Sequence, residues 1–172
     1  MIFRPAQFSD YENIAKLHAD SWQKTYRNVF SEKFLEQDVE QDRKNTWYDR
    51  LRNPLQNQYV TVAVKDQRIV GFSCIYLNDD PIYGTLLDNL HVASDLHKSG
   101  VGKSLMKECA KYIYEKSGNK KMYLWVFELN ENARKMYDHL GAANVETVDK
   151  KHTDNTSARA CRYCWDDVSV FF

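Results

Sequence analysis

The sequence predicts a mixed α/β (α+β) fold of seven strands and four helices, and two observations lead to this expectation. Segments with strand character alternate with helical ones in the order β-α-α-β-β-β-α-β-α-β-β. The 172 residues, of which 43% are apolar and 13% aromatic, suffice for one compact domain with a hydrophobic core. We therefore expect residues 1–172 to form a single domain.

The first three elements are a short strand and two helices. Residues 2–4 have strand character, and Asp10 can cap the helix that follows. That helix places Ile14 and Trp22 on about the same face. A second helical stretch covers about residues 31–51.

A β-hairpin is the plainest element of the sequence. Valines alternate with other residues from Tyr59 to Val64, Asp66 and Gln67 supply a turn, and a second strand returns over 69–77. The polar segment 78–81, which ends in a proline, is expected to terminate this strand.

The next unit is a strand, a loop and a helix. Residues 86–92 form the strand, and the loop 97–103 contains two glycines. The helix runs to about Lys116, because apolar residues recur at four-residue steps and Ser117 and Gly118 then end the pattern.

The last four elements are three strands and a helix. Residues 122–127 form an unbroken apolar run, which predicts a strand in the middle of a sheet. Asn130 can cap the next helix, and Gly141 lies where a helix-terminating glycine belongs. Strands near 144–148 and 159–165 complete the chain.

Composition argues against several classes of protein. The 24 Lys and Arg residues balance the 24 Asp and Glu residues, so no basic surface indicates nucleic-acid binding. No apolar run approaches the roughly 20 residues of a membrane span, and the N-terminus lacks the core of a signal peptide, so we expect a cytoplasmic protein without membrane contact. Cys161 and Cys164 have no second ligand pair, so we expect reduced thiols and no metal site.

The loop before the third helix has the features of an anion site. The first N–H groups of a helix have no partner and carry partial positive charge. Gly100 and Gly102 let backbone donors approach a phosphate, and Lys98 and Lys103 add charge.

Three phosphate motifs compete for this loop. The Walker motif matches at Gly102-Lys103-Ser104, but its first glycine would fall on His97. The dinucleotide motif G-x-G-x-x-G needs a third glycine where Leu105 stands. The third motif is [Q/R]-x-x-G-x-[G/A], which fits from His97 to Gly102 except at its first position.

This third motif is the signature of the GNAT superfamily of N-acetyltransferases, which the chain resembles over almost its whole length. Residues 87–92 are similar to the family's strand before the loop, and residues 130–142 resemble its N-x-x-A-x-x-x-Y-x-x-x-G-F segment. The opening segment 3–6 is also similar. Two residues depart from the pattern: His97 replaces Gln or Arg, and Ala142 replaces Phe.

The resemblance implies a mostly antiparallel seven-stranded sheet with helices on both faces, splayed between its fourth and fifth strands. It also implies acetyl-CoA as co-substrate, no metal, and direct attack by the primary amine of a small molecule or peptide. The residues implied to bind the cofactor are Leu90, His91, Val92, His97, Lys98, Ser99, Gly100, Val101, Gly102, Lys103, Ser104, Asn130, Ala133 and Tyr137.

The family mechanism requires two proton movements. Tyr137 is the candidate donor to the leaving thiolate, because a phenol stays protonated at neutral pH. The candidate bases are Asp88, His91 and Glu128, and a water chain can replace them. Asp88 is the first choice, because it shares strand parity with Leu90.

The amine acceptor is the least defined part of the site. Trp22, Tyr26 and the acidic pair at 79–80 are candidate contacts. A homodimer through an exposed edge at residues 159–165 is a further expectation for the family. Two other functions stay open from the sequence: a non-catalytic acyl-CoA-binding module, and a nucleotide-binding protein.

Overall fold

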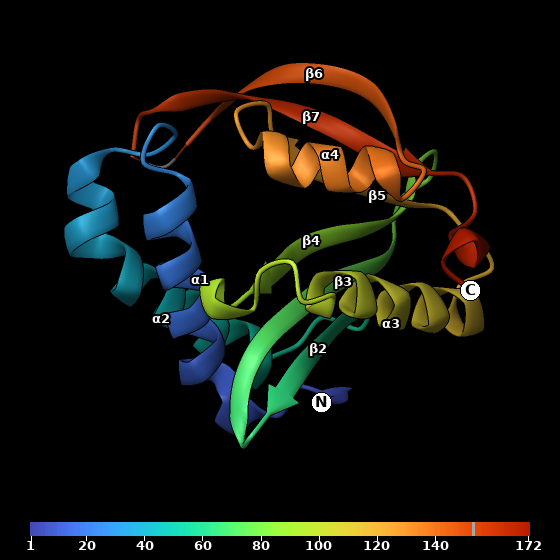
Figure 1. Ribbon diagram of the computed structural model, residues 1–172, viewed down its shortest axis with the longest axis horizontal. Coiled ribbons are helices and arrows are strands. Elements are labelled where there is room, and N and C mark those ends of the chain that lie inside the picture. Colours follow the sequence, from blue (N-terminus) through green and yellow to red (C-terminus); the bar gives the residue numbers. More distant parts are fainter. Residues whose placement is uncertain (153) are drawn as a thin grey trace.

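The computed structural model describes residues 1–152 and 154–172, and its seven strands form one sheet in the order β1-β2-β3-β4-β5-β7-β6 (Figure 1). Every neighbouring pair is antiparallel except β4 and β5. The predicted mostly antiparallel sheet and the central place of β5 are confirmed. The strands are β1 (Ile2–Pro5), β2 (Gln58–Lys65), β3 (Arg68–Asp80), β4 (Gly84–Val92), β5 (Met122–Phe127), β6 (Ala143–Lys151) and β7 (Ser157–Trp165).

Helices cover both faces of the sheet, as the resemblance implied. On one face α1 and α2 bury Ile14 and Trp47 against Val62 and Phe72 of the hairpin. On the other face lie α3 and α4, below the strands β5, β6 and β7 in Figure 1. The helices are α1 (Tyr11–Thr25), α2 (Val39–Arg52), α3 (Val101–Lys116) and α4 (Glu131–His139), with a π-helical turn at Phe34–Asp38 before α2.

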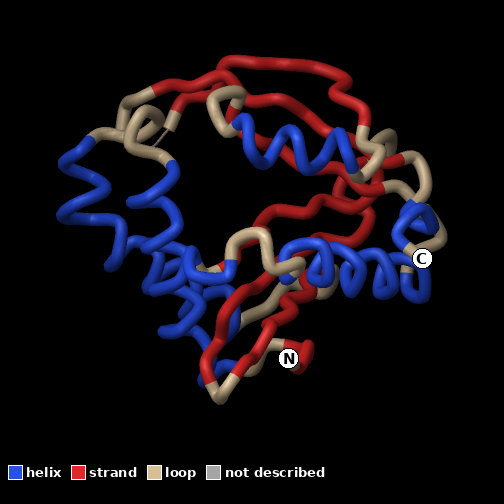
Figure 2. Tube along the Cα trace, in the orientation of Figure 1, coloured by secondary structure: helices blue, strands red, loops and turns tan. Residues whose placement is uncertain are grey.

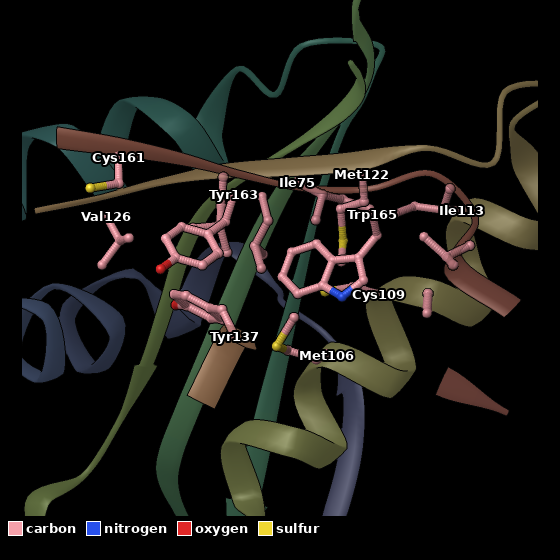
Figure 3. Packing of buried hydrophobic residues seen from close by; sticks show 14 residues of the cluster. Ile75, Met106, Cys109, Ile113, Met122, Val126, Tyr137, Cys161, Tyr163 and Trp165 are labelled. Carbon is pink, nitrogen blue, oxygen red and sulfur yellow. The ribbon is translucent and has the colours of Figure 1, made fainter. Parts of the chain in front are cut away.

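The larger core lies between the sheet and the pair α3 and α4. Figure 3 shows Met106 of α3 and Tyr137 of α4 packed below Tyr163 and Trp165 of β7. The indole N–H of Trp165 donates to the Leu140 carbonyl at 2.9 Å, so its polar atom is satisfied. Burial of these large side chains fixes α4 against the sheet, at roughly 1.5–3 kcal/mol for each fully buried apolar side chain.

The sheet opens between β4 and β5. These strands pair only at Thr85 with Met122 and at Leu86 with Tyr123, and they diverge beyond these pairs (Figure 1). The closed end depends on Gly84, where a Cβ would lie 2.5 Å from the Lys121 carbonyl oxygen. The predicted splay between the fourth and fifth strands is therefore present.

A β-bulge in β4 accompanies the opening. Cys74 of β3 faces Asn89, but the next residue, Ile75, faces Leu87, so Asp88 has no partner on β3. A bulge bends its strand and turns side chains away from simple alternation. Asp88 is therefore presented at the point where the sheet splits.

Two local expectations from the sequence are wrong. Asp10 does not cap α1 through its side chain; its carboxylate accepts from the Arg4 guanidinium at 2.7 and 2.9 Å and from the Gln7 amide at 2.8 Å. The strand β3 does not end before residue 78 but continues to Asp80, which pairs with Gly84 of β4 beyond an irregular stretch where Asn78 has a φ of 50°.

The expected edge at residues 159–165 is also wrong. That segment belongs to β7, which lies between β5 and β6, so β6 forms this edge of the sheet. The homodimer itself stays a prediction. Within residues 1–152 and 154–172, no helix has the length and apolar character that crossing a membrane requires.

Candidate functional site

A cavity of about 610 Å³ occupies the opening between β4 and β5. Its wall brings together segments that lie far apart in the sequence: the end of α1, the strands β4 and β5, the loop before α3, and α4. The predicted site residues in this wall are Tyr26, Asp88, Leu90, His91, Val92, His97, Lys98, Gly100, Val101, Gly102, Lys103, Asn130, Ala133 and Tyr137. Trp22, Ser99 and Ser104 lie outside the lining.

The loop before α3 presents backbone donors to this cavity (Figure 2, tan segment before the helix). Gly100 is the N-cap residue of α3 with a φ of 87°, a left-handed conformation that favours glycine. Among the described residues, no hydrogen-bond acceptor pairs with the amides of Val101, Gly102 or Lys103. These amides can therefore bind an anion, and Lys98 and Lys103 add positive charge.

The side chains of His97 and Ser99 are engaged within the loop itself. His97 Nε2 donates to the Val92 carbonyl at 3.1 Å, and Ser99 Oγ donates to the Leu96 carbonyl at 2.6 Å. His97 therefore fastens the loop to the end of β4. The anion-binding capacity of the loop rests on its backbone and on its lysines.

Tyr137 forms a buried wall of the cavity and is 7% exposed. Burial raises the pKa of its phenol, and the neighbouring Tyr26 raises it further, so the hydroxyl stays protonated. Figure 3 shows its hydroxyl oxygen at the same end of the cluster as that of Tyr163. Asn130 fixes the start of α4 by accepting from the Ala133 amide at 3.3 Å, as the sequence predicted.

Asp88 lines the cavity, but it does not share a face of the strand with Leu90, as the sequence had suggested. The Arg50 guanidinium donates to Asp88 Oδ2 and to Asn89 Oδ1, both at 2.8 Å, so two consecutive side chains point to the same face. Simple alternation with Leu90 is therefore wrong, because the bulge removes it. Arg50 holds the carboxylate at the cavity wall.

The other two candidate bases, His91 and Glu128, have surroundings that differ from those of Asp88. His91 Nδ1 lies 2.9 Å from Ser21 Oγ, and burial, followed by the Arg43 charge, lowers the pKa of His91 to about 3. The imidazole is therefore neutral near pH 7. Glu128 lies outside the cavity lining, and its carboxylate pairs with Arg159 at 3.2 Å.

The residues predicted to contact the amine take different places. Tyr26 lines the cavity, whereas Trp22 stacks on Phe30 at 4.7 Å, with the Arg43 guanidinium 4.4 Å from its ring centroid. Trp22 thus supports the segment between α1 and α2.

The acidic pair at 79–80 is engaged away from the cavity. Asp79 accepts from the Tyr123 hydroxyl at 2.5 Å, and Asp80 accepts from the amides of Ile82 and Tyr83 at 2.7 and 2.9 Å. Neither residue belongs to the lining of the cavity.

Several residues at the opening were missed in the sequence. Trp125 lines the cavity from β5, and its place in the apolar run of that strand was a usable signal. Lys150 and Arg162 lie over its ring at 3.7 and 4.5 Å from the centroid, and Arg162 pairs with Glu146 at 2.8 Å. Long-range contacts of this kind leave no local pattern in a sequence.

No group of three or more His, Cys, Asp or Glu side chains in the described part of the chain is arranged to hold a metal ion. Cys161 and Cys164 are both free thiols.

Comparison with known proteins identifies the class of protein to which this open sheet and helix N-terminus belong. The sequence profile of the acetyltransferase (GNAT) family matches residues 14–142. The chain therefore belongs to the GNAT family of acetyltransferases and is an acyltransferase. The nucleotide-binding and non-catalytic alternatives lose their support.

One relative in sequence and two solved structures of similar fold agree with this family assignment. The protein called "Uncharacterized N-acetyltransferase YuaI" from Bacillus subtilis (strain 168) is 25% identical over 129 residues, which cover 74% of this chain and 72% of that protein. A ribosomal-protein-alanine N-acetyltransferase from Brucella melitensis has a TM-score of 0.73 at 16% identity, covering 96% of this chain and 99% of that one. The PaiA N-acetyltransferase from Thermoplasma acidophilum, solved in complex with coenzyme A, has a TM-score of 0.70 at 19% identity, covering 92% and 96%.

Proposed function

We propose that this protein transfers an acetyl group from acetyl-CoA to a primary amine of a small molecule or peptide by direct attack. One observation carries the proposal: a single cavity joins unpaired amides at the start of α3, the open edge of β4 and the protonated hydroxyl of Tyr137. The structural neighbour PaiA, which was solved with coenzyme A, supports the choice of cofactor.

The residues of the cavity fit the parts of acetyl-CoA. The amides of residues 101–103, with Lys98 and Lys103, would hold the pyrophosphate. Beyond Leu86, β4 has no partner on β5, so its backbone can pair with an extended pantetheine arm. The apolar side chains of Leu90 and Val126 line the same opening.

Acetyl-CoA supplies the activated acetyl group, and the chain manages its charges and protons. A backbone N–H of β4 at the opening polarises the thioester carbonyl. Tyr137 donates a proton to the leaving sulfur, and Asp88, held by Arg50, accepts the proton that leaves the amine. One proton is thus taken up and one is released.

Thermal stabilisation tests the cofactor first. At about 100 times its dissociation constant, acetyl-CoA stabilises the protein by roughly 2.7 kcal/mol, whereas ATP and NAD leave the unfolding temperature unchanged. Free thiol is then released from acetyl-CoA in the presence of a panel of amines. Stabilisation by ATP instead of acetyl-CoA, or no thiol release with any amine or acyl donor, would overturn the proposal.

A further inference from the structure

Lys150 lies in an unusual place at the opening of the sheet. Its ammonium is 3.7 Å from the ring centroid of Trp125, and Trp125 lines the cavity beside Asp88. Lys150 is half-buried, and among the described residues no carboxylate lies within 4 Å of its ammonium. A positive charge is therefore held next to a cavity-lining side chain, without a carboxylate in salt-bridge range.

The nearby carboxylates already have partners. Asp88 pairs with Arg50 at 2.8 Å, and Glu146 pairs with Arg162 at 2.8 Å. Arg162 also lies 4.5 Å from the centroid of Trp125, so it adds a second positive charge to the same ring. With Arg50 and Arg162 paired in this way, Lys150 is the cation beside Trp125 for which no carboxylate lies within 4 Å among the described residues.

This arrangement is costly without a ligand. Burial lowers the pKa of Lys150, and the charge of Arg162 lowers it further, whereas the more distant charges of Asp88 and Glu146 raise it without cancelling the shift. A half-buried cation is stabilised when a negative group pairs with it, and such charge-assisted hydrogen bonds are the strong ones.

We infer that Lys150, with Arg162 beside it, binds an acidic group of the acceptor, so that the preferred substrate is an amine that also carries a carboxylate or phosphate. This inference rests on the proposed acetyltransferase function.

Matched pairs of acceptors test the inference. Linear ω-amino acids of increasing chain length are compared with their amides, and aminoalkyl phosphates with the corresponding amino alcohols. The acidic member of the better pair should have a kcat/KM roughly ten- to a hundredfold above that of its neutral partner. The two series separate a carboxylate preference from a phosphate preference.

Variants identify the residue responsible. Lys150→Met should abolish the preference by raising KM for the acidic amine, with little change for the neutral one and none in acetyl-CoA affinity. Lys150→Arg should restore much of the preference. Lys151→Met is the matched control, because Lys151 is exposed on the same strand and should retain wild-type behaviour.

The outcomes separate the two proposals. Equal kcat/KM within every pair, or a preference that survives Lys150→Met, would overturn the acidic-group site. Calorimetric binding of the same compounds in the presence of coenzyme A, which carries no acetyl group, tests the site without turnover. A Lys150-dependent preference in binding without any thiol release would uphold the anion site and overturn the transferase proposal alone.

Discussion

Alanine at position 102 should stabilise the free protein and at the same time weaken its binding of acetyl-CoA. Gly102 lies in the first turn of α3, and a Cβ there would meet only Val92 Cγ2, at an ordinary contact distance of 3.7 Å. Alanine is the better helix former, so Gly102→Ala should raise the free energy of unfolding by about 0.5 kcal/mol. For a chain of this size, that is about 1–2 °C in unfolding temperature.

The effect on the cofactor has the opposite sign. The added methyl group stands at the cavity wall, where unpaired amides of the loop would meet the pyrophosphate. Loss of one charge-assisted hydrogen bond of about 1.5–3 kcal/mol raises the dissociation constant of acetyl-CoA by roughly ten- to a hundredfold.

Two further variants of the loop serve as controls. Gly100 has a φ of 87°, and a Cβ at this position would have no other atom within 4 Å, so Gly100→Ala introduces backbone strain without a clash, at about 1–2 kcal/mol. It should lower stability as well as affinity. His97→Ala removes one hydrogen bond to Val92 and should weaken binding far less than Gly100→Val or Gly102→Val.

Urea unfolding and calorimetric titration with acetyl-CoA measure both quantities for each variant. Wild-type affinity in Gly102→Ala would show that the backbone of the loop does not hold the cofactor. Equal losses in His97→Ala and Gly102→Val would show that the histidine side chain is a main contact.

Three other predictions concern the proton donor, the buried histidines and the segment that precedes α2. Tyr137→Phe should lower kcat by on the order of a hundredfold with unchanged acetyl-CoA affinity in titration, and an unchanged kcat would remove Tyr137 from the mechanism. Burial, followed by His91, holds the pKa of His18 well below its usual value, and burial lowers that of His91 to about 3. The two histidines therefore bind protons in the unfolded chain below about pH 6.5, whereas they stay neutral in the folded one. The free energy of unfolding should be highest above that pH and should fall between pH 6.5 and 5, by up to about 1.4 kcal/mol per pH unit for each histidine. Urea unfolding should show this slope and its reduction in His91→Gln, and equal stability at pH 7 and 5 would contradict it. The Asp154 carboxylate accepts from the Ser31 amide at 2.7 Å, so Asp154→Ala should increase hydrogen exchange at that amide; unchanged protection would show that this bond does not hold the segment.

Local sequence signals predicted the parts of the fold that local physics controls. The apolar run at 122–127 identified a central strand, because a strand buried on both faces shows no alternation. Asn130 was predicted at the start of its helix because its side chain suits an N-cap position. The family resemblance supplied the splay, which no local pattern encodes.

Predictions that depended on register or distant contacts were less successful. Asp88 was assigned the wrong face because one extra residue in β4 shifts alternation, and a bulge has no dependable sequence signal. Asp10 bonds Arg4 across a turn instead of capping its helix. Arg50 and Lys150 reach the opening from α2 and β6, so only the assembled structure reveals them.

The transfer of an acetyl group to an amine is the central claim, and one measurement tests it most directly. The protein is incubated with acetyl-CoA and an amine panel, and free thiol and N-acetylated amine are quantified together, the latter by mass spectrometry. We expect equal amounts of both products, with a rate that falls in Tyr137→Phe. Tight binding of acetyl-CoA without acetylated amine, or thiol release that is independent of the amine, would contradict the claim.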